Sequence, residues 1–367
     1  MNKYDVCIIG GGVMGCSAAY ELSKKGYKTV ILEKGKAGQE SSGAAAGLLG
    51  VQAEWDEYDP LFDLARKSRA MFPDLSKELR EVSGIDIGYE EKGIYKIAET
   101  EEELAALEKT AVWQSETGEP AELLTRKDLL KQEPLLSNHV TGGVYYPKDG
   151  HVIAPALTKA FEQSALHYGT EIFEYTTVEK IIVENGKTAG VRANGRIFHA
   201  DTVLIAAGAW SSAFLKSFNL LYETYPVKGE IISVLSKKKL VGSPLYKHGF
   251  YIVPKRGGRY IIGATVKERD FTKEVSLTGM SSLMETAKRI LPSIENANFE
   301  KAWSGFRPQS ASKDPYMERH PEVKGLYACT GHYRNGILLS PAAGKMMLEL
   351  MEREPVLTGG NQFESEN

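Results

Sequence analysis

The feature that most constrains the fold is a glycine cluster close to the start of the chain. A buried strand is predicted from Tyr4 to Ile9 and runs directly into GGGVMG, residues 10–15. These glycines open an amphipathic helix that is predicted to stop at Gly26, and a second strand, residues 28–32, ends in Glu33. This order of strand, glycine turn, helix, strand and acid is the fingerprint of a dinucleotide-binding α/β unit.

Each part of the fingerprint has a chemical role. Gly10 allows the tight turn, Gly12 lets the backbone approach a pyrophosphate, and Gly15 lets the helix lie close to the strand. The N–H groups at the helix N-terminus favour phosphate. Glu33 can accept both ribose hydroxyls and disfavours a 2′-phosphate, which argues against NADP. The alternative interpretation is a glycine-rich turn in another α/β protein.

Composition narrows the class of protein. The 367 residues predict two domains, and the net charge of −3 gives no support to nucleic-acid or anionic-membrane binding. No apolar run approaches the roughly 18 residues of a membrane span, and because the sequence goes straight into the nucleotide fold, no signal peptide is predicted. The three cysteines lack metal-ligand spacing, so no metal site and a reducing, cytoplasmic setting are predicted.

The rest of the chain alternates between two patterns, which predicts two interleaved domains. A Rossmann-type nucleotide domain is expected from residues 1–84, 151–220 and 301–367, and a mixed antiparallel-sheet substrate domain from residues 85–150 and 221–300. Within them we expect a helix over residues 61–82 with a break or kink at Pro73, a hairpin around Glu91–Gly93, and a last helix from about Pro341. The polar tail after Pro355 is expected to fray.

Several segments outside the fingerprint are candidates to hold the cofactor. The small-residue tract KAGQESSGAAAGLLG, residues 36–50, lets backbone amides approach a flat ligand, and its Ser41 and Ser42 can donate to phosphate. Val178 can meet an adenine through its backbone, and Gly208 follows the strand that returns to the nucleotide domain. The chain has a single fingerprint, so the site holds either NAD or FAD. A second glycine-rich helix start, GHYRNGILLSPAAGK, favours the longer FAD.

Arg307, Arg334 and Tyr251 are the polar candidates for binding a substrate. A guanidinium binds a carboxylate bidentately, and a tyrosine hydroxyl can donate to the same group. The alternatives are ion-paired arginines and a core tyrosine. No catalytic acid or base is predicted. If the reaction is oxidation of an amine by a flavin, a neutral substrate amine can pass a hydride to flavin N5 without one. His332 either tunes this step or only packs.

The motifs together resemble a known family. GGGVMG with Glu33, SSGAAAGLLG, PVKGE, FYIVP, IIGAT, GFRP and GHYRNGILLSPA are similar to those of the FAD-dependent glycine oxidases of thiamine biosynthesis, within the D-amino acid oxidase and sarcosine oxidase superfamily. The resemblance covers about residues 3–352. It implies that superfamily's fold, non-covalent FAD, a homotetramer, and conversion of glycine, O2 and water to glyoxylate, ammonia and H2O2. Sarcosine and small D-amino acids are implied side substrates, and glycine imine would feed thiazole synthesis.

The resemblance also implies roles for individual positions. Arg307 matches the carboxylate-binding arginine and Tyr251 its hydroxyl partner, while Arg334 borders substrate and flavin. Gly50 and Val266 are expected near the substrate. The family has methionine at the positions of Val266 and Leu48, so these two substitutions would change the size of the substrate pocket. The expected flavin contacts are Val13, Met14, Glu33, Lys34, Ser41, Ser42, Ala46, Gly47, Leu48, Val178, His332, Tyr333, Arg334, Asn335, Gly336, Ile337 and Leu338.

Other functions remain open on the sequence alone. An FAD-dependent D-amino acid dehydrogenase would pass its electrons to a quinone or a protein. A non-catalytic flavin-binding protein would show no reduction by amines. An NAD dehydrogenase leaves the C-terminal glycine segment, residues 331–345, without a role.

Overall fold

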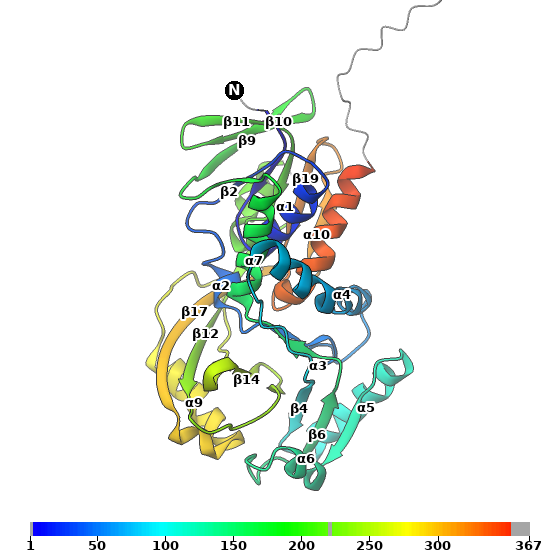
Figure 1. Cartoon of the computed structure of the whole chain (residues 1–367), viewed down its shortest axis with the longest axis vertical. Coiled ribbons are helices and arrows are strands. Elements are labelled where there is room, and N and C mark those ends of the chain that lie inside the picture. The colour runs from blue at the N-terminus through cyan, green and yellow to red at the C-terminus, as the bar shows by residue number, and fades with distance from the viewer. Residues whose placement is uncertain (1–2, 219–221, 354–367) are drawn as a thin grey trace, which may run out of the picture.

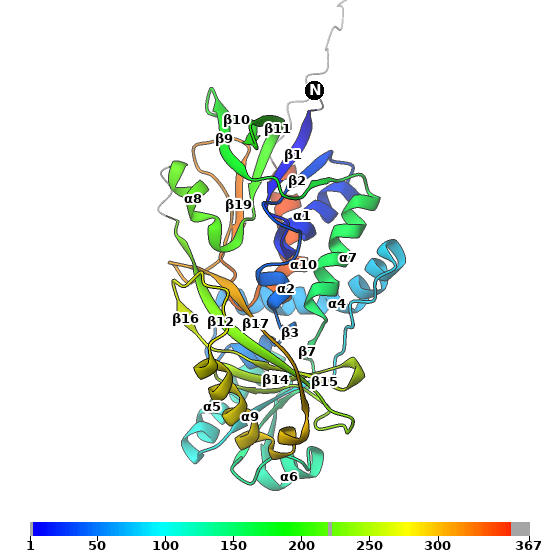
Figure 2. The ribbon, with the colours of Figure 1, turned by 90° about the vertical axis from the view of Figure 1, so that its left-hand side faces the viewer.

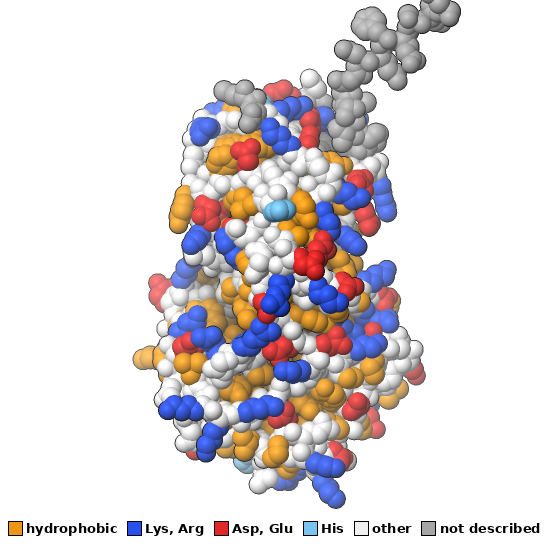
Figure 3. Space-filling model, viewed as in Figure 1, with side chains coloured by type: hydrophobic (Ala, Val, Ile, Leu, Met, Phe, Trp, Pro, Cys, Tyr) orange, Lys and Arg blue, Asp and Glu red, His pale blue; other side chains and the backbone are white. Residues whose placement is uncertain are grey.

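Two β-sheets lie one above the other along the long axis of the molecule (Figure 1). The computed structural model describes residues 3–218 and 222–353. Early, middle and late parts of the chain meet in the upper half, so the predicted α/β architecture with a nucleotide-type sheet and a mixed second sheet is confirmed. On the face in Figure 3, basic and acidic side chains are interspersed, in keeping with the small net charge. None of the described helices is long and apolar enough to cross a membrane.

The first sheet has a parallel centre built around the first strand. Its strands run in the order β18–β19–β11–β1–β2–β8, and β9 and β10 extend from β11. The bounds are β1 Tyr4–Ile9, β2 Thr29–Leu32, β8 Glu171–Phe173, β9 Val178–Glu184, β10 Lys187–Ala193, β11 Arg196–Ile205, β18 Tyr316–Arg319 and β19 Leu326–Thr330. Strand β1 pairs in parallel with both β2 and β11, which aligns the carboxyl ends of all three at one edge.

Both faces of this sheet are buried, which explains why β1 is apolar throughout. Val6 and Ile8 pack into the core under the helices, whereas Cys7 and Ile9 pack into a separate core with β9 and β10. Figure 2 shows the helices on one side of the sheet and the β9–β10 hairpin on the other. The helices of this half are α1 Val13–Lys24, α4 Pro60–Ser83, α7 Ala154–His167 and α10 Gly336–Glu352.

The glycine turn has the geometry that the fingerprint requires. Gly10 has a φ of +108°, a left-handed conformation that favours glycine. At Gly15 a side chain would place Cβ only 2.0 Å from the carbonyl oxygen of Gly10. Helix α1 can therefore lie against the end of β1 only because position 15 has no side chain.

The second sheet is mixed and lies below the first. Its strands run in the order β16–β12–β15–β14–β13–β4–β6–β5, with β17 on the other edge of β12. The bounds are β4 Ile94–Ala98, β5 Glu122–Thr125, β6 Gly142–Tyr146, β12 Thr224–Leu235, β13 Leu245–Lys247, β14 Phe250–Lys255, β15 Arg259–Gly263, β16 Lys267–Glu268 and β17 Asn298–Ser310. The remaining described helices and strands are α2 Ser41–Ala44, β3 Leu48–Leu49, α3 Val51–Glu54, α5 Glu101–Glu116, α6 Arg126–Gln132, β7 Gly150–His151, α8 Ser212–Leu215 and α9 Leu277–Ile290. There are 3₁₀ turns at Gly208–Trp210, Lys216–Phe218, Arg256–Gly258 and Pro292–Asn296.

One predicted domain border falls inside a strand. Strand β17 continues past residue 301 and pairs with β12 as far as Thr224 opposite Ser310. Residues 301–310 thus belong to the second sheet and not to the nucleotide sheet, because they pair in one unbroken register with residues 224–233 of β12. The predicted border at residue 220 and the predicted fraying of the tail after Pro355 lie outside the described residues.

Two local predictions need correction. Helix α4 continues through Pro73, so of the predicted break or kink the break was wrong and the kink stays a prediction. The buried side chains of α4, Phe62, Phe72 and Leu79 among them, pack into the core, and this packing outweighs the single hydrogen bond that a proline removes. The Glu91–Gly93 turn does not close a hairpin, because Glu90 forms a bridge with His151 and β4 pairs with the distant β6 and β13.

The last helix begins earlier than predicted, at Gly336, and Pro341 lies inside it. A proline has no N–H to bond the carbonyl oxygen four residues before it, here that of Ile337. The Ser340 hydroxyl donates to this oxygen at 2.9 Å, and Ser17 of α1 donates to the carbonyl oxygen of Ser340 at 2.7 Å. Side-chain hydroxyls therefore satisfy the interrupted helix and attach it to α1.

Replacing Ser340 by alanine should lower stability. The substitution leaves the buried Ile337 carbonyl without a donor, at a cost of about 1–3 kcal/mol. Thermal unfolding followed by circular dichroism should show a lower midpoint for Ser340→Ala. Ser281→Ala, an exposed serine in helix α9, is the control and should leave the midpoint nearly unchanged. Equal midpoints for the two variants would contradict this account of α10.

Candidate functional site

A cavity of about 400 Å³ lies where the carboxyl ends of the parallel strands face the second sheet. Its walls come from the end of β1, the segment after β2, the residues that follow β11, strands β14 and β17, and the start of α10. The carboxyl edge of a parallel sheet is the expected place for a ligand in an α/β fold. Segments from all parts of the chain therefore meet at one site.

Most of the predicted cofactor positions line this cavity. They are Gly10, Gly12, Val13, Met14, Glu33, Lys34, Ser41, Ser42, Ala46, Gly47, Leu48, Val178, Gly208, His332, Tyr333, Arg334, Asn335, Gly336 and Ile337. Two predicted positions do not line it. Gly15 lies beneath the turn against the Gly10 carbonyl, and Leu338 points into the helical core.

The fingerprint end of the cavity is held by side chains that bond backbone amides. The Glu33 carboxylate accepts the N–H of Gly11 and that of Gly35, each at 2.8 Å, which holds it beside the glycine turn. The Ser42 hydroxyl oxygen accepts the Val13 N–H at 2.9 Å, so its own proton is free to be donated. The Ser41 hydroxyl instead donates to the Phe306 carbonyl, so the prediction of a Ser41–phosphate contact does not fit this geometry.

The opposite end of the cavity carries the predicted carboxylate-binding groups. Arg307 on β17 and Tyr251 on β14 both line it. The Arg307 guanidinium donates to the Thr265 carbonyl at 3.2 Å, and it lies so close to Gly229 that a Cβ there would be 2.5 Å from it. Within residues 3–218 and 222–353, Arg307 forms no ion pair, so its charge faces the cavity without a carboxylate partner. Burial raises the pKa of Tyr251 to about 12, against the opposing effect of Arg307.

Arg334 differs from Arg307 because it has an acidic partner. The Glu54 carboxylate lies 3.8 Å from the Arg334 guanidinium, and the buried Tyr246 side chain lines the same cavity. Although burial acts to lower it, Glu54 raises the pKa of Arg334, and burial together with Glu54 raises the pKa of Tyr246. Sequence reasoning missed Glu54 and Tyr246. Glu54 follows the small-residue tract by only four positions, which was the available signal.

The two positions predicted near the substrate are placed differently. Gly50 lines the cavity at the start of helix α3. Val266 does not line it: its side chain is 51% exposed, although its neighbour Thr265 accepts from Arg307. The chain leaves β15 at Gly263, so the backbone at Thr265 faces the site while the next side chain turns to solvent.

His332 is buried in the cavity wall with an unsatisfied ring. Its side chain is 4% exposed, and Nε2 has no hydrogen-bond partner among the described residues. Burial lowers the pKa of His332 to about 3, so the ring is neutral at ordinary pH. Cys329 is buried beside it, and burial raises the pKa of this thiol to about 12. Within the described ranges, no group of three or more His, Cys, Asp or Glu side chains has the geometry of a metal site.

Comparison with known proteins places this geometry in a family context. A family model described as "FAD dependent oxidoreductase" matches residues 5–350. The solved structure of a glycine oxidase from Bacillus cereus ATCC 14579 is 52% identical, covers 96% of this chain and 98% of its own, and has a TM-score of 0.92. A glycine oxidase from Geobacillus kaustophilus is 42% identical over 96% of this chain and 94% of its own length, and its solved structure has a TM-score of 0.94.

A third relative has a second function in its name. The bifunctional protein ThiO/ThiG from Trichormus variabilis is 30% identical over 96% of this chain, and the match spans 54% of that longer protein. The similarity to the two glycine oxidases, by contrast, extends over nearly the whole of both chains.

The buried neutral His332 should make the fold sensitive to acid. The folded-state pKa of about 3 lies below the value of about 6.5 for an unfolded histidine. The unfolded chain therefore binds more protons below pH 6.5, and stability falls as pH drops toward 3. This contribution amounts to about 2 kcal/mol between pH 7 and pH 5.

His332→Gln should thus lose less of its thermal midpoint between pH 7 and pH 5 than the parent protein, measured by calorimetry at equal cofactor content. His139→Gln, at an exposed position, is the control and should keep the parent's pH dependence. The same acid sensitivity in parent and His332→Gln would show that His332 does not resist protonation.

Proposed function

The chain belongs to the FAD-dependent oxidoreductase family, and on that premise we propose that it oxidises glycine with O2 and water to glyoxylate, ammonia and H2O2. Sarcosine and small D-amino acids are the proposed side substrates. Relatives with glycine oxidase in their names at 42% and 52% identity support this substrate class. The cofactor is FAD.

The described residues fit FAD on observations of this structure. The glycine turn and the start of α10 both line the cavity, and the orphaned Nε2 of His332 is a buried polar atom in its wall, with no hydrogen-bond partner among the described residues. We propose that the fingerprint glycines and the N-terminus of α1 hold the pyrophosphate, that Glu33 holds the ribose, and that Val178 meets the adenine. Residues 332–337 would border the flavin ring.

The observation that carries the proposal is the guanidinium of Arg307, which forms no ion pair among residues 3–218 and 222–353 and lines the same cavity as Tyr251. An arginine without a carboxylate of its own, in the wall of a cavity, is suited to bind the carboxylate of a small amino acid. Tyr251 stays protonated at neutral pH because burial raises its pKa to about 12, so its hydroxyl can donate to the same carboxylate. Together the two groups orient the substrate by its carboxylate end.

The protein is proposed to bind and orient the substrate without acting as an acid or base. Bound FAD supplies the two-electron acceptor for amine oxidation. Arg307 and Tyr251 neutralise and fix the carboxylate, and His332 remains neutral in the wall. The substrate amine reacts in its neutral form, so activity should rise with pH as the bound amine loses its proton. Water outside the cavity then hydrolyses the released imine to glyoxylate and ammonia.

Two alternatives are distinguished by one experiment. The purified protein is examined by visible spectroscopy before and after addition of glycine without oxygen. Flavin bands near about 375 and 450 nm, bleached by glycine and restored by air, would support an oxidase. Bleaching that air does not restore would favour an FAD-dependent D-amino acid dehydrogenase. A flavin that no amino acid bleaches would favour a non-catalytic flavin-binding protein, and a colourless protein that takes up no FAD would overturn the proposal.

Replacing Arg307 by alanine should weaken substrate binding. The substitution removes a charge-assisted contact worth roughly 2–4 kcal/mol, which corresponds to a KM for glycine about 30- to 900-fold higher with a smaller change in kcat. Steady-state kinetics measure both constants. Arg259→Ala is the control, because Arg259 on β15 pairs with Glu300 outside the cavity. An unchanged KM in Arg307→Ala would refute the carboxylate-binding role.

We also propose that the protein is a cytoplasmic homotetramer and that its FAD is bound non-covalently. Light scattering tests the oligomeric state. Release of flavin into solution on acid precipitation tests the mode of FAD binding. The three cysteines are buried free thiols, which fits a reducing compartment and offers no ready thiolate for a covalent link. Supply of glycine imine for the thiazole of thiamine is the proposed metabolic role. The match to a protein named ThiO/ThiG supports it.

A further inference from the structure

A buried carboxylate outside the cavity holds the short helix α3. Asp149, in the turn between β6 and β7, is fully buried and accepts the backbone N–H groups of Val51, Gln52 and Ala53, each at 3.0 Å. One side chain thus bonds every amide of the first turn of α3. A helix of four residues has too few internal hydrogen bonds to hold its own position. Its orientation therefore depends on such outside contacts.

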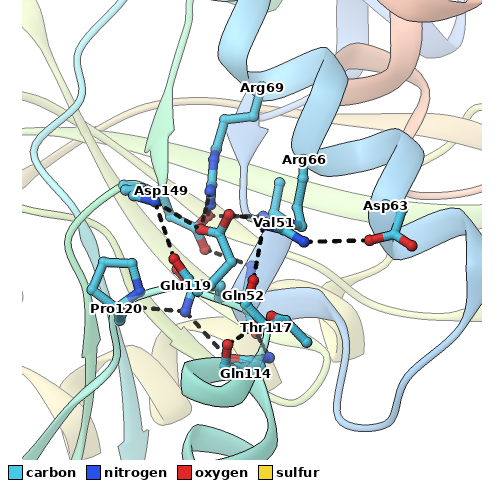
Figure 4. A network of polar contacts seen from close by, with 12 residues as sticks. Val51, Gln52, Asp63, Arg66, Arg69, Gln114, Thr117, Glu119, Pro120 and Asp149 are labelled. Atoms are coloured by element: carbon cyan, nitrogen blue, oxygen red, sulfur yellow. Dashed lines mark hydrogen bonds and ion pairs between the residues drawn. The ribbon is translucent and has the colours of Figure 1, made fainter.

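Asp149 is itself held by a network of charges (Figure 4). Arg69 on α4 donates to the Asp149 carboxylate at 2.5 Å, and its other terminal nitrogen donates to Glu119, which follows α5. Arg66, one turn earlier on α4, donates to Glu119 at 2.7 Å. Both Arg69 and Glu119 are buried. The network therefore ties α3 to the long helix of the nucleotide half and to the helical edge of the second sheet.

Both ends of α3 reach the cavity. Gly50, immediately before the helix, and Glu54, at its last position, line it. Glu54 forms an ion pair with Arg334, which also lines the cavity. A shift or rotation of α3 would therefore move the carboxylate that determines where the Arg334 guanidinium lies.

We propose that Asp149, held by Arg69, is a positioning residue that sets Glu54 against Arg334 and thereby sets the affinity for the amino acid substrate. The proposal rests on the proposed glycine oxidation. A buried ion pair is by itself weak evidence for stability, because apolar residues of the same volume are often as stable. The contacts of Asp149 with three successive amides, one turn from a cavity residue, give the pair a geometric role.

The test variant is Asp149→Asn, which keeps the shape of the side chain. An asparagine offers one acceptor oxygen and directs its NH2 group at donors, so part of the bonding to α3 is lost. We expect KM for glycine to rise about tenfold while kcat stays within about twofold. Hydrogen–deuterium exchange followed by mass spectrometry should show faster exchange in peptides that cover residues 50–55.

A double-mutant cycle separates positioning from general destabilisation. If Asp149 acts through Glu54, Asp149→Asn should raise KM by less than about twofold in a Glu54→Gln background. Glu133→Gln is the matched control: Glu133 is also a buried carboxylate that accepts a backbone N–H, from Gly242, and it lies away from the cavity. It should lower the thermal midpoint without changing KM or the exchange of residues 50–55.

Each outcome decides between the possibilities. An unchanged KM in Asp149→Asn, or the same fold rise in both backgrounds, would overturn the positioning role. If Asp149→Asn does not fold, Arg69→Lys takes its place in the cycle. This variant keeps a positive charge beside Asp149 but loses the second hydrogen bond, to Glu119. A smaller rise in KM is then expected. A parent protein that glycine does not reduce would overturn the proposed function, whereas an active parent with an unaltered variant overturns only the role of Asp149.

Discussion

The parallel pairing of β1 with β2 and β11 is the interaction on which the rest of the molecule depends. It aligns three carboxyl strand ends, so that Gly10, Glu33 and Gly208 meet at one edge although almost 200 residues separate the first from the last. Burial on both faces holds this register, because a slip by one residue would exchange the side chains of the two cores. The glycine turn then lets α1 close over the edge, and the cavity begins there.

The long pairing of β12 with β17 positions the part of the cavity wall that carries Arg307. Strands β12 and β17 run antiparallel from the lower sheet up to the nucleotide half (Figure 2), and Arg307 lies three residues before the end of β17, opposite Val227. Two hydrogen bonds join β17 to helix α2: the Ser41 hydroxyl donates to the Phe306 carbonyl, and the Trp303 ring N–H donates to the Ala44 carbonyl. The two halves are therefore joined along the wall of the cavity.

The sequence led to most of the residues that line the cavity. The fingerprint, the final glycine segment and Arg307 are each recognisable because neighbours in sequence carry the signal. Most of the failures depended on distant partners. Helix α4 continues through Pro73 because it packs on the core, and β4 pairs with β6 and β13 instead of forming a hairpin. Glu54 and Tyr246 were missed for the same reason. The early start of α10 is the exception, because the donor that replaces the missing N–H of Pro341 is its neighbour Ser340.

The sequence by itself determined the family, the cofactor class and the α/β fold class with a nucleotide-type sheet and a mixed second sheet, because glycine turns, strand periodicity and the acid at Glu33 act over short distances along the chain. Only the tertiary structure decided which charges are paired. Arg307 and Arg334 look alike in sequence, yet one faces the cavity without a carboxylate partner among the described residues while the other is paired with Glu54. The difference arises because electrostatic partners are chosen by distance in space, and the fold brings Asp149, Arg69 and α3 together from three separate parts of the chain.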